Sequence, residues 1–525
     1  MAFLPLTAVI LFASVAAAIP CASITAPAVP GATVLSVIGT EMLNITIPPF
    51  PILLPTGVSG LNVCNVNVNL THSGVNDNVL VEVWLPLEGW NGRFQGTGGG
   101  GWATGSGSIA LAAAAGAGYS GATTDGGHAN NVIDPSAWAL DSNGTVNSGL
   151  LTNFASRSLH DMAVVGKAVT AQFYGRSPSY SYWNGCSTGG RQGLMEAQKY
   201  PADYNGILAI SPAINWPSFI MAEQWPQVVM EQKKTFPTQC IFDTFTADSI
   251  LQCDMLDGVK DGVIGDPENC AFDPYKLVGS TVTCDSTEVT ITHAMADVVS
   301  KILDGPTNIL GQQLWYGLKV GTPFNGIALT VPGPNRTTIG APFPISDSWI
   351  RYFLKRNPNF NTSAITYLDY SLLFAQSNSE YERVIGTNNP DLSAFSATGG
   401  KMITWHGLSD PLIFPDGTLK YRQWVERAMG GRSAVDKFYR VFFAPGVGHC
   451  GMGSGPVPMD PLDALVAWVE KGTAPETLAA ATTDASGATV TKNICRYPLV
   501  SRYNGNGDPK SAASYSCASS FASAA

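Results

Sequence analysis

The sequence predicts an α/β protein in which a parallel β-sheet is covered by helices and interrupted once by a long insertion. Three observations predict this class. Strand-like runs alternate with helical patterns, the alternation stops in the middle of the chain, and a serine between two glycines joins one strand to a helix. Parallel strands need long crossover connections, which helices usually supply.

The strand-like runs are rich in β-branched and aromatic residues and lie at 79–87, 118–125, 179–185, 206–213, 401–407 and 438–446. Helical patterns follow at 158–175 and 191–201. The alternation stops between about residues 213 and 390, where long polar loops, tryptophans and four cysteines occur. We therefore expect a catalytic α/β domain made of residues 19–212 and 391–525, with a lid domain of residues 213–390 inserted into it.

The charge balance argues against a nucleic-acid partner. Only 13% of the residues are charged, and the net charge is −10. Binding to a phosphate backbone needs clustered Lys and Arg, which this chain lacks.

The first residues indicate export. Residues 1–18 are apolar and end in three alanines, which is typical of a signal peptide. The run is shorter than a membrane-spanning helix, and Pro20 follows it, so we expect no membrane anchor. Ten cysteines are compatible with five disulfides in an oxidising compartment. Sequons for N-glycosylation occur at Asn44, Asn69, Asn143, Asn335 and Asn361.

The segment "SYWNGCSTGGRQG", residues 181–193, contains a serine in a G-x-S-x-G motif. Ser187 lies between Gly185 and Gly189, with a strand pattern before it and a helical pattern after it. A sharp strand-to-helix turn exposes the hydroxyl and frees backbone N–H groups to bind an oxyanion. This arrangement predicts an α/β-hydrolase fold with Ser187 as the nucleophile.

A serine nucleophile needs a general base and an acid that orients it. In this fold both follow the serine, each in a loop after a later strand. Asp410 and His449 occupy such loops, so the predicted order is Ser187, Asp410, His449. His406 is either a core histidine or a residue that lines the substrate pocket, and His128 is either structural or directed towards that pocket.

Two cysteines adjoin the predicted catalytic residues. Cys186 precedes Ser187, and Cys450 follows His449. Because the serine and the histidine have to come within hydrogen-bond reach, the two cysteines must also approach each other. We expect a disulfide between them, which would restrict the unfolded chain as well as hold the two loops together.

Several longer motifs occur in order along the chain: "WNGRF", "GTGGGGW", "TTDGGH", "GCSTGGRQGLMEAQKYPADYNGI", "HGLSD", "GHCGMG" and "AWVEKGTAPE". Together with the paired cysteines they resemble the tannase and feruloyl esterase family of secreted α/β-hydrolases, over nearly the whole mature chain. The resemblance implies that Ser187, Asp410 and His449 form the catalytic triad.

The resemblance also implies where the oxyanion is held. One donor is the N–H of Thr188, and the other is the N–H of Gly101, with Gly100 as the alternative because the four-glycine run blurs the register. A phosphate-binding loop is the competing interpretation of this run, but the Gly-Lys-Ser/Thr ending is missing. No organic cofactor is implied.

Members of the family carry a structural calcium ion in the lid. The matching segment is "CDMLDGVKDGVIGDPENC", residues 253–270. It offers the carboxylates of Asp254, Asp257 and Asp261 and the carbonyls of Val259 and Val263, which are hard oxygen donors of the kind that Ca²⁺ prefers. The spacing is not that of an EF-hand, and a bare acidic loop is the alternative.

Three further disulfides are implied by the resemblance: Cys253–Cys270, Cys495–Cys517 and Cys21–Cys64. Cys240 and Cys284 then remain to pair with each other. This last pair departs from the family, which has a short local bridge near Cys284.

The activity implied by the resemblance is that of a secreted serine carboxylic ester hydrolase. It would release aromatic acids, such as ferulic and other hydroxycinnamic acids, from plant cell-wall esters by two-step acyl transfer. A tannase that hydrolyses galloyl esters is the alternative. A more distant alternative is a non-catalytic, calcium-stabilised extracellular binding protein, although such proteins usually lose a triad residue.

Overall fold

The computed structural model describes residues 18–51 and 54–519. Nearly all of the expected signal peptide lies outside these residues. The main feature is a nine-stranded sheet with the strand order β1-β2-β3-β5-β4-β6-β7-β12-β13. Its strands are β1 (Ala32–Ile47), β2 (Val58–His72), β3 (Val79–Pro86), β4 (Arg93–Thr97), β5 (Ser120–Thr124), β6 (Tyr180–Cys186), β7 (Gly206–Ile210), β12 (Lys401–Gly407) and β13 (Tyr439–Ala444).

The sheet is parallel from β5 to β13 and antiparallel from β1 to β5. All six strand-like runs of the sequence form strands here, and the expected α/β-hydrolase class is confirmed. Three strands of the sheet are not among the predicted runs: β1 and β2, which form a long antiparallel hairpin, and the short parallel strand β4. The signal of β2 is the alternation of Asn with Val from Asn65 to Asn69, which is the period of a half-buried strand.

Helices cover both faces of the sheet. Apolar side chains of α3 (Ser158–Tyr174), α4 (Thr188–Lys199) and α11 (Pro415–Ala428) share one buried cluster with the sheet. Side chains of α1 (Gly107–Gly116) and α13 (Pro461–Lys471) pack in two other clusters. Neighbouring residues of β6 show the division, since Trp183 belongs to the first cluster and Tyr182 to the cluster of α13.

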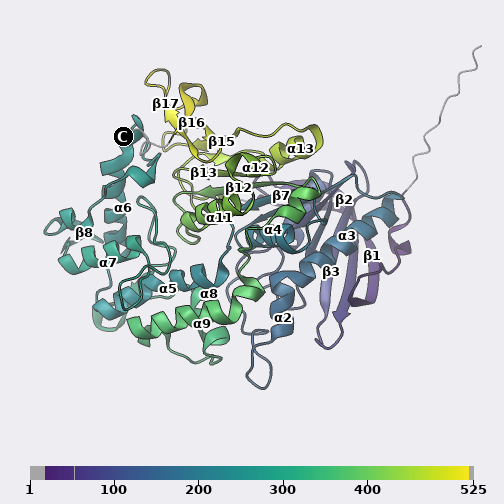
Figure 1. The fold of residues 1–525 in the computed structure, drawn as a ribbon, viewed down its shortest axis with the longest axis horizontal. Coiled ribbons are helices and arrows are strands. Elements are labelled where there is room, and N and C mark those ends of the chain that lie inside the picture. The colour runs from purple at the N-terminus through teal and green to yellow at the C-terminus, as the bar shows by residue number, and fades with distance from the viewer. Residues whose placement is uncertain (1–17, 52–53, 520–525) are drawn as a thin grey trace, which may run out of the picture.

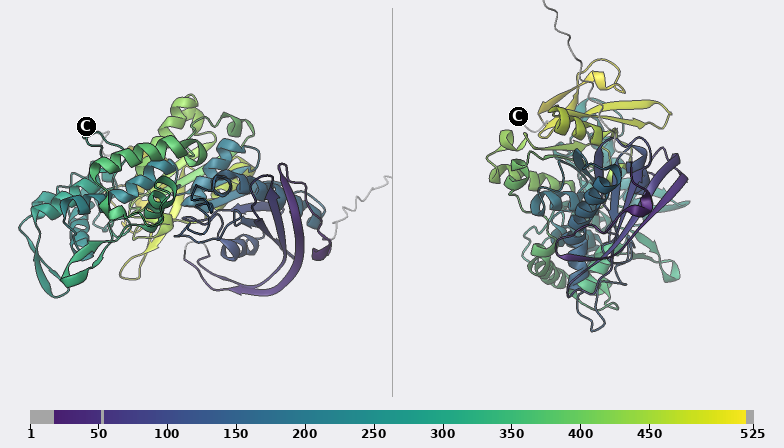
Figure 2. Two further views of the ribbon diagram at one scale, coloured as in Figure 1. Left: turned by 90° about the horizontal axis from the view of Figure 1, so that it is seen from below. Right: turned by 90° about the vertical axis from the view of Figure 1, so that its right-hand side faces the viewer.

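Residues 211–400, all of them described, add no strand to the large sheet. This segment is mainly helical, and most of its helices gather on the side of the molecule away from β1 and β2 (Figures 1 and 2). The gathered helices are α5 (Trp216–Lys233), α6 (Gln239–Cys253), α7 (His293–Asp304), α8 (Pro344–Ser348) and α9 (Tyr367–Ile385), whereas α10 (Ser393–Ala397) packs against α4. We call residues 213–390 of this segment the lid, and its core also includes Trp102, Trp138 and Phe154 from outside it.

Short elements complete the structure. In the lid, β8 (Thr281–Cys284) pairs with β9 (Thr287–Thr290), and β10 (Thr330–Pro332) pairs with β11 (Thr338–Gly340). Near the C-terminus, β14 (Val457–Pro458), β15 (Thr477–Thr483) and β16 (Thr489–Cys495) form one sheet, and β17 (Leu499–Tyr503) pairs with β18 (Tyr515–Ser519). The remaining helices are α2 (Ser148–Thr152) and α12 (Arg432–Val435). No helix within the described ranges is both long and apolar enough to cross a membrane.

Candidate active site

Ser187 lies at the turn between β6 and α4, where the sequence predicts the nucleophile. Its backbone has φ 63° and ψ −124°, a conformation that non-glycine residues rarely adopt. Two hydrogen bonds hold this strained turn, from the Ser187 N–H to Ile210 O at 3.0 Å and from the Ala213 N–H to Ser187 O at 3.1 Å. The turn therefore fixes the serine at the carboxyl end of the parallel strands.

Glycines allow this turn to be tight. A Cβ at Gly185 would lie 2.6 Å from the carbonyl of Gly189, closer than carbon atoms can approach. The glycine run after β4 packs directly on the same turn, since the Gly189 N–H donates to Gly99 O at 3.0 Å. Gln192 of α4 joins the two segments, because its Oε1 accepts from the Gly99 N–H at 3.0 Å.

His449 and Asp410 come together as expected. The Nδ1 of His449 lies 2.8 Å from Oδ2 of Asp410, and both residues are buried. The backbone N–H groups of Leu412 and Ile413 donate to Oδ1 of Asp410, each at 2.9 Å. Burial by itself would raise the pKa of Asp410, but the charges and hydrogen bonds of His449 and His406 outweigh it and hold the pKa below its ordinary value. The carboxylate is thus stabilised in its ionised form.

A disulfide joins the residues next to Ser187 and His449. Cys186 and Cys450 are bonded, with their Cα atoms 5.9 Å apart, as the adjacency of these residues in the sequence predicts. No hydrogen bond joins Ser187 Oγ to His449 in the described structure. Such bonds are often long without substrate and tighten in the complex.

His406 supports Asp410 from the interior of the protein. It has no exposed surface, and its Nε2 lies 3.2 Å from Asp410 Oδ2 and 3.1 Å from Ile413 O. Its Nδ1 is 2.9 Å from Thr418 Oγ1. The expectation that His406 lines a substrate pocket is therefore wrong, because the ring is enclosed by polar partners, and the core alternative describes it.

Gly101 lies beside the residue that follows the nucleophile. The hydroxyl of Thr188 donates to Gly101 O at 2.8 Å. Gly101 has φ 54°, and a Cβ there would collide with Val132 O at 2.1 Å, whereas Gly100 borders open space. Within the described residues, the N–H groups of Gly101 and Thr188 have no acceptor. Both groups are thus free to bind an anionic oxygen next to Ser187, and the contact with Thr188 favours Gly101 over Gly100.

His128 is structural. Its ring stacks on Trp138 with the ring centres 4.4 Å apart, and its nitrogens lie 3.0 Å from Thr104 Oγ1 and 3.1 Å from Ala129 O. Burial lowers the pKa of His128 to about 4, so the neutral ring is favoured.

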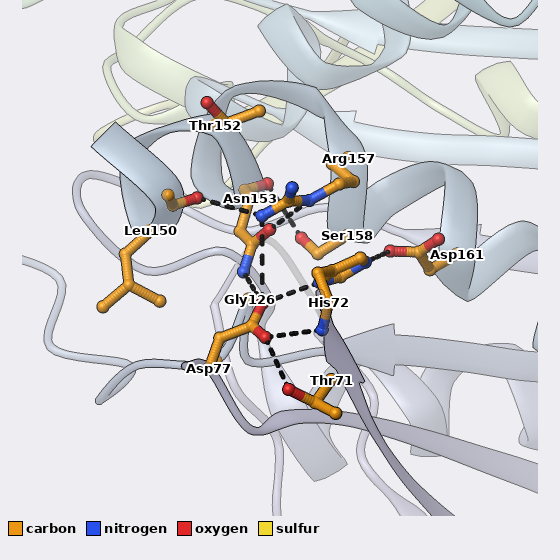
Figure 3. Close-up of polar contacts among 12 residues, drawn as sticks. Thr71, His72, Asp77, Gly126, Leu150, Thr152, Asn153, Arg157, Ser158 and Asp161 are labelled. Carbon is orange, nitrogen blue, oxygen red and sulfur yellow. Dashed lines mark hydrogen bonds and ion pairs between the residues drawn. The ribbon is translucent and has the colours of Figure 1, made fainter. Parts of the chain in front are cut away.

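A second buried histidine–carboxylate cluster lies around His72 (Figure 3). His72, at the end of β2, contacts Asp77 Oδ2 through Nδ1 at 2.7 Å and Asp161 Oδ2 through Nε2 at 3.0 Å. Asn153 also donates to Asp77, at 2.7 Å. The cluster ties β2 to α3 and contains no serine in a strained turn. These residues are not among the predicted site residues.

The aspartates expected to bind calcium lie in one loop of the lid. Asp254 accepts from the N–H of Gly262 at 3.0 Å, and Asp261 is paired with Lys492 at 2.8 Å. Burial raises the pKa of Asp257 to about 6, and the charges of Asp261 and Asp254 add to the rise. The donors are all oxygens and a cation would relieve this repulsion, so the residues fit calcium by type. Nevertheless, no three His, Cys, Asp or Glu side chains converge as a metal-binding group in the described ranges.

The other cysteine pairs match the expectations. Cys21–Cys64, Cys240–Cys284, Cys253–Cys270 and Cys495–Cys517 are all bonded. Four of the sequon asparagines are exposed: Asn44, Asn143, Asn335 and Asn361. Asn69 is half-buried within β2, and its amide donates to Ser36 Oγ at 3.2 Å. Its glycosylation would cost this contact.

The chain was compared with known proteins. The family model for "Tannase and feruloyl esterase" matches residues 64–518. A "Probable feruloyl esterase" from Arthroderma benhamiae is 52% identical over 96% of this chain and 94% of its own. Among solved structures, the tannin acyl hydrolase from Aspergillus niger is similar with a TM-score of 0.84, at 26% identity, over 96% of this chain and 94% of its own. Feruloyl esterase B from Aspergillus oryzae follows with a TM-score of 0.78, at 29% identity, over 94% of this chain and 97% of its own.

Proposed function

Because the chain belongs to the tannase and feruloyl esterase family and is a carboxylic ester hydrolase, we propose that Ser187, His449 and Asp410 carry out its reaction. One observation supports this assignment above the others. The Cys186–Cys450 disulfide holds the serine turn against the histidine loop, while His449 is hydrogen-bonded to Asp410 at 2.8 Å. Both contacts support a role for His449 as the base between the nucleophile and a buried carboxylate.

The proposed reaction is a two-step acyl transfer. Ser187 Oγ attacks the ester carbonyl carbon while His449 Nε2 takes the hydroxyl proton, and Asp410 stabilises the resulting imidazolium. The N–H groups of Thr188 and Gly101 hold the oxyanion. His449 then returns the proton to the leaving alcohol. Water attacks the acyl-enzyme with His449 again as the base, and the acid leaves as Ser187 regains its proton.

For the substrate we favour esters of hydroxycinnamic acids, such as ferulic acid, in plant cell walls. The names of the curated relatives support this choice, and the fold shared with a tannin acyl hydrolase keeps galloyl esters as the second candidate. Hydrolysis of methyl ferulate, methyl caffeate and methyl gallate should be compared. We expect the highest kcat/KM with methyl ferulate, and a higher value with methyl gallate would identify a tannase instead.

We also propose that the protein is exported and N-glycosylated. The five disulfides support an oxidising compartment, where such bonds persist. The apolar residues 1–18 and the exposed sequons support passage through a secretory pathway. Peptide mapping of protein from the culture medium, before and after enzymatic deglycosylation, would give the mature N-terminus and the occupied asparagines.

The disulfide beside the triad leads to a prediction about activity. We expect the double variant Cys186→Ala, Cys450→Ala to lose about a hundredfold in kcat, since a misplacement of about 1 Å between reacting groups costs that much. The measurement is kcat on methyl ferulate well below the melting temperature of each variant.

The matched control is Cys495→Ala, Cys517→Ala, which removes a disulfide between β16 and β18, away from the triad. We expect it to lose stability, by about 2–5 kcal/mol, with kcat nearly unchanged. A folded Cys186, Cys450 variant with wild-type kcat would show that this bridge serves stability alone.

Calcium is proposed as a structural ion held by Asp254, Asp257, Asp261 and the carbonyls of Val259 and Val263. When bound, it would neutralise the crowded carboxylates of this loop. Removal by a chelator, or Asp257→Ala, should lower Tm with little change in kcat at low temperature. An ion at about 100 times its Kd stabilises the fold by about 2.7 kcal/mol.

Asp243→Ala is the control, because Asp243 is an exposed carboxylate on helix α6 of the same lid. It should not change the response of Tm to calcium. Metal analysis of dialysed protein that finds no calcium, together with a Tm that does not respond to the chelator, would remove the site.

A further inference from the structure

The glycine run that holds Gly101 is attached to the lid through the next residue. Trp102 is fully buried, and its indole N–H donates to Ser348 Oγ at 2.8 Å. Ser348 is the last residue of α8, 246 positions along the chain. Its own hydroxyl proton is used elsewhere, since it donates to Ile345 O at 3.0 Å. The serine oxygen is thus oriented to accept from the indole.

Rings from the lid enclose the indole. Phe353 stacks on Trp102 with the ring centres 5.1 Å apart and the planes at 17°. Trp349 lies 6.2 Å away at 19°, and Trp216 meets Trp102 edge-on at 5.4 Å. Because the ring is buried among these groups, its position follows the lid segment that carries Ser348.

The backbone beside the indole is held by groups outside the lid. The Trp102 N–H donates to Val132 O at 2.8 Å, and Gly101 O accepts from the Thr188 hydroxyl at 2.8 Å. The Trp102 N–H and Gly101 O belong to one rigid peptide plane, so these two hydrogen bonds hold that plane in place. The Gly101 N–H lies in the preceding plane and is joined to it only through the φ and ψ rotations of Gly101, so a shift of the Trp102 ring reaches it through a short stretch of backbone. The Gly101 N–H is therefore positioned by the lid on one side and by the serine turn on the other.

We propose that Trp102 and Ser348 are a positioning pair through which the lid sets the place of the Gly101 oxyanion donor. The inference rests on the proposed function of Gly101 at Ser187. The lid then contributes to the transition state as well as to substrate binding. A donor that acts only in the transition state affects kcat, and uniform substrate binding affects KM.

The test uses two indole–serine hydrogen bonds of the same chemistry. Trp349 Nε1 donates to Ser377 Oγ at 3.0 Å inside the lid, and Ser377 is buried as Ser348 is. Ser348→Ala and Ser377→Ala each leave a buried indole N–H without its acceptor, so both should lower Tm by similar amounts. We expect only Ser348→Ala to lower kcat on methyl ferulate, by about tenfold to a hundredfold, with KM nearly unchanged.

Two further variants separate positioning from packing. Trp102→Phe keeps an aromatic ring and removes the N–H, and it should lower kcat as Ser348→Ala does. Ser348→Thr keeps the hydroxyl and should restore kcat. The rate at which a fluorophosphonate labels Ser187 should fall in parallel with kcat, because the phosphonyl oxygen uses the same donors.

Labelling of Ser187 in the unaltered protein identifies the nucleophile independently. Equal kcat values for Ser348→Ala and Ser377→Ala would overturn the positioning pair and leave the assignment of Ser187 intact. The positioning pair would also be overturned if both variants lost kcat in proportion to their loss of Tm, because the effect would then be one of stability.

Discussion

Ser187→Ala is expected to lower kcat for aromatic methyl esters by at least about four orders of magnitude, the range found when a catalytic serine is removed. Alanine keeps the Cβ, so the backbone at φ 63° is no more strained than before and the fold should be unchanged. Tm and circular dichroism would establish that the variant folds. Activity above about a tenth of the wild-type value would show that another group is the nucleophile.

Ser177→Ala is the control, since Ser177 is exposed and lies just before β6, in the same stretch of chain. A fluorophosphonate should label the wild type and Ser177→Ala once, at Ser187, and should not label Ser187→Ala. Absence of labelling in the wild type would contradict an activated serine and favour the non-catalytic alternative for this site.

Asp410→Asn is expected to lower kcat by about 10⁴, because an amide in place of the carboxylate favours the wrong tautomer of the neighbouring histidine. The position is unusual in that both His449 and His406 contact the same oxygen, Oδ2, at 2.8 and 3.2 Å. An amide there removes the charge that both rings contact. It presents either its oxygen or its NH₂ group to them, depending on its orientation. Asp463→Asn, which alters an exposed carboxylate on α13, should leave kcat unchanged.

The same substitution should change the dependence of stability on pH. The pKa of Asp410 in the folded protein lies below its ordinary value of about 3.9. Its ionised form therefore stabilises the fold above about pH 4, and this contribution is lost as the pH falls through the lowered pKa. Acid unfolding of Asp410→Asn should accordingly be less steep below pH 4. A profile parallel to that of the wild type would show that Asp410 does not stabilise the fold in this way.

The sequence revealed those parts of the site that depend on local chemistry. Ser187 can be predicted because a tight turn demands glycines at fixed offsets. His449 can be predicted because it lies in a loop after a late strand, and Cys450 beside it mirrors Cys186. Contacts between side chains distant in sequence left no comparable signal. The hydrogen bond from Trp102 to Ser348 joins residues in different motifs, and nothing in "HGLSD" distinguishes a histidine that supports Asp410 from one that faces a substrate.

The fold also has parts that the sequence pattern predicts and parts that it does not. Most of the parallel strands lie in runs rich in β-branched and aromatic residues, which the sequence pattern reveals. The strands that it does not reveal are β4, which is short and partly polar, and β1 and β2, which expose one face and mix Val with Asn, Thr and Ser. In the calcium loop the type of ligand could be predicted, but a contact with a distant residue could not. Its carboxylates were identified by type and spacing, but the partner that Asp261 has in the structure, Lys492, comes from β16, more than 200 positions later.

The Cys186–Cys450 bridge has a consequence for how the protein is made. During synthesis, Cys186 emerges 264 residues before its partner, and the four lid cysteines appear in between. Those four form short nested bridges, spanning 44 and 17 positions, and all four thiols are present once the lid has been translated. N-terminal parts of a chain fold first, so the thiol of Cys186 waits through the whole of lid folding, exposed to exchange with its neighbours. We expect oxidation at the triad to come late, which makes a disulfide isomerase a requirement for producing active enzyme in a foreign host.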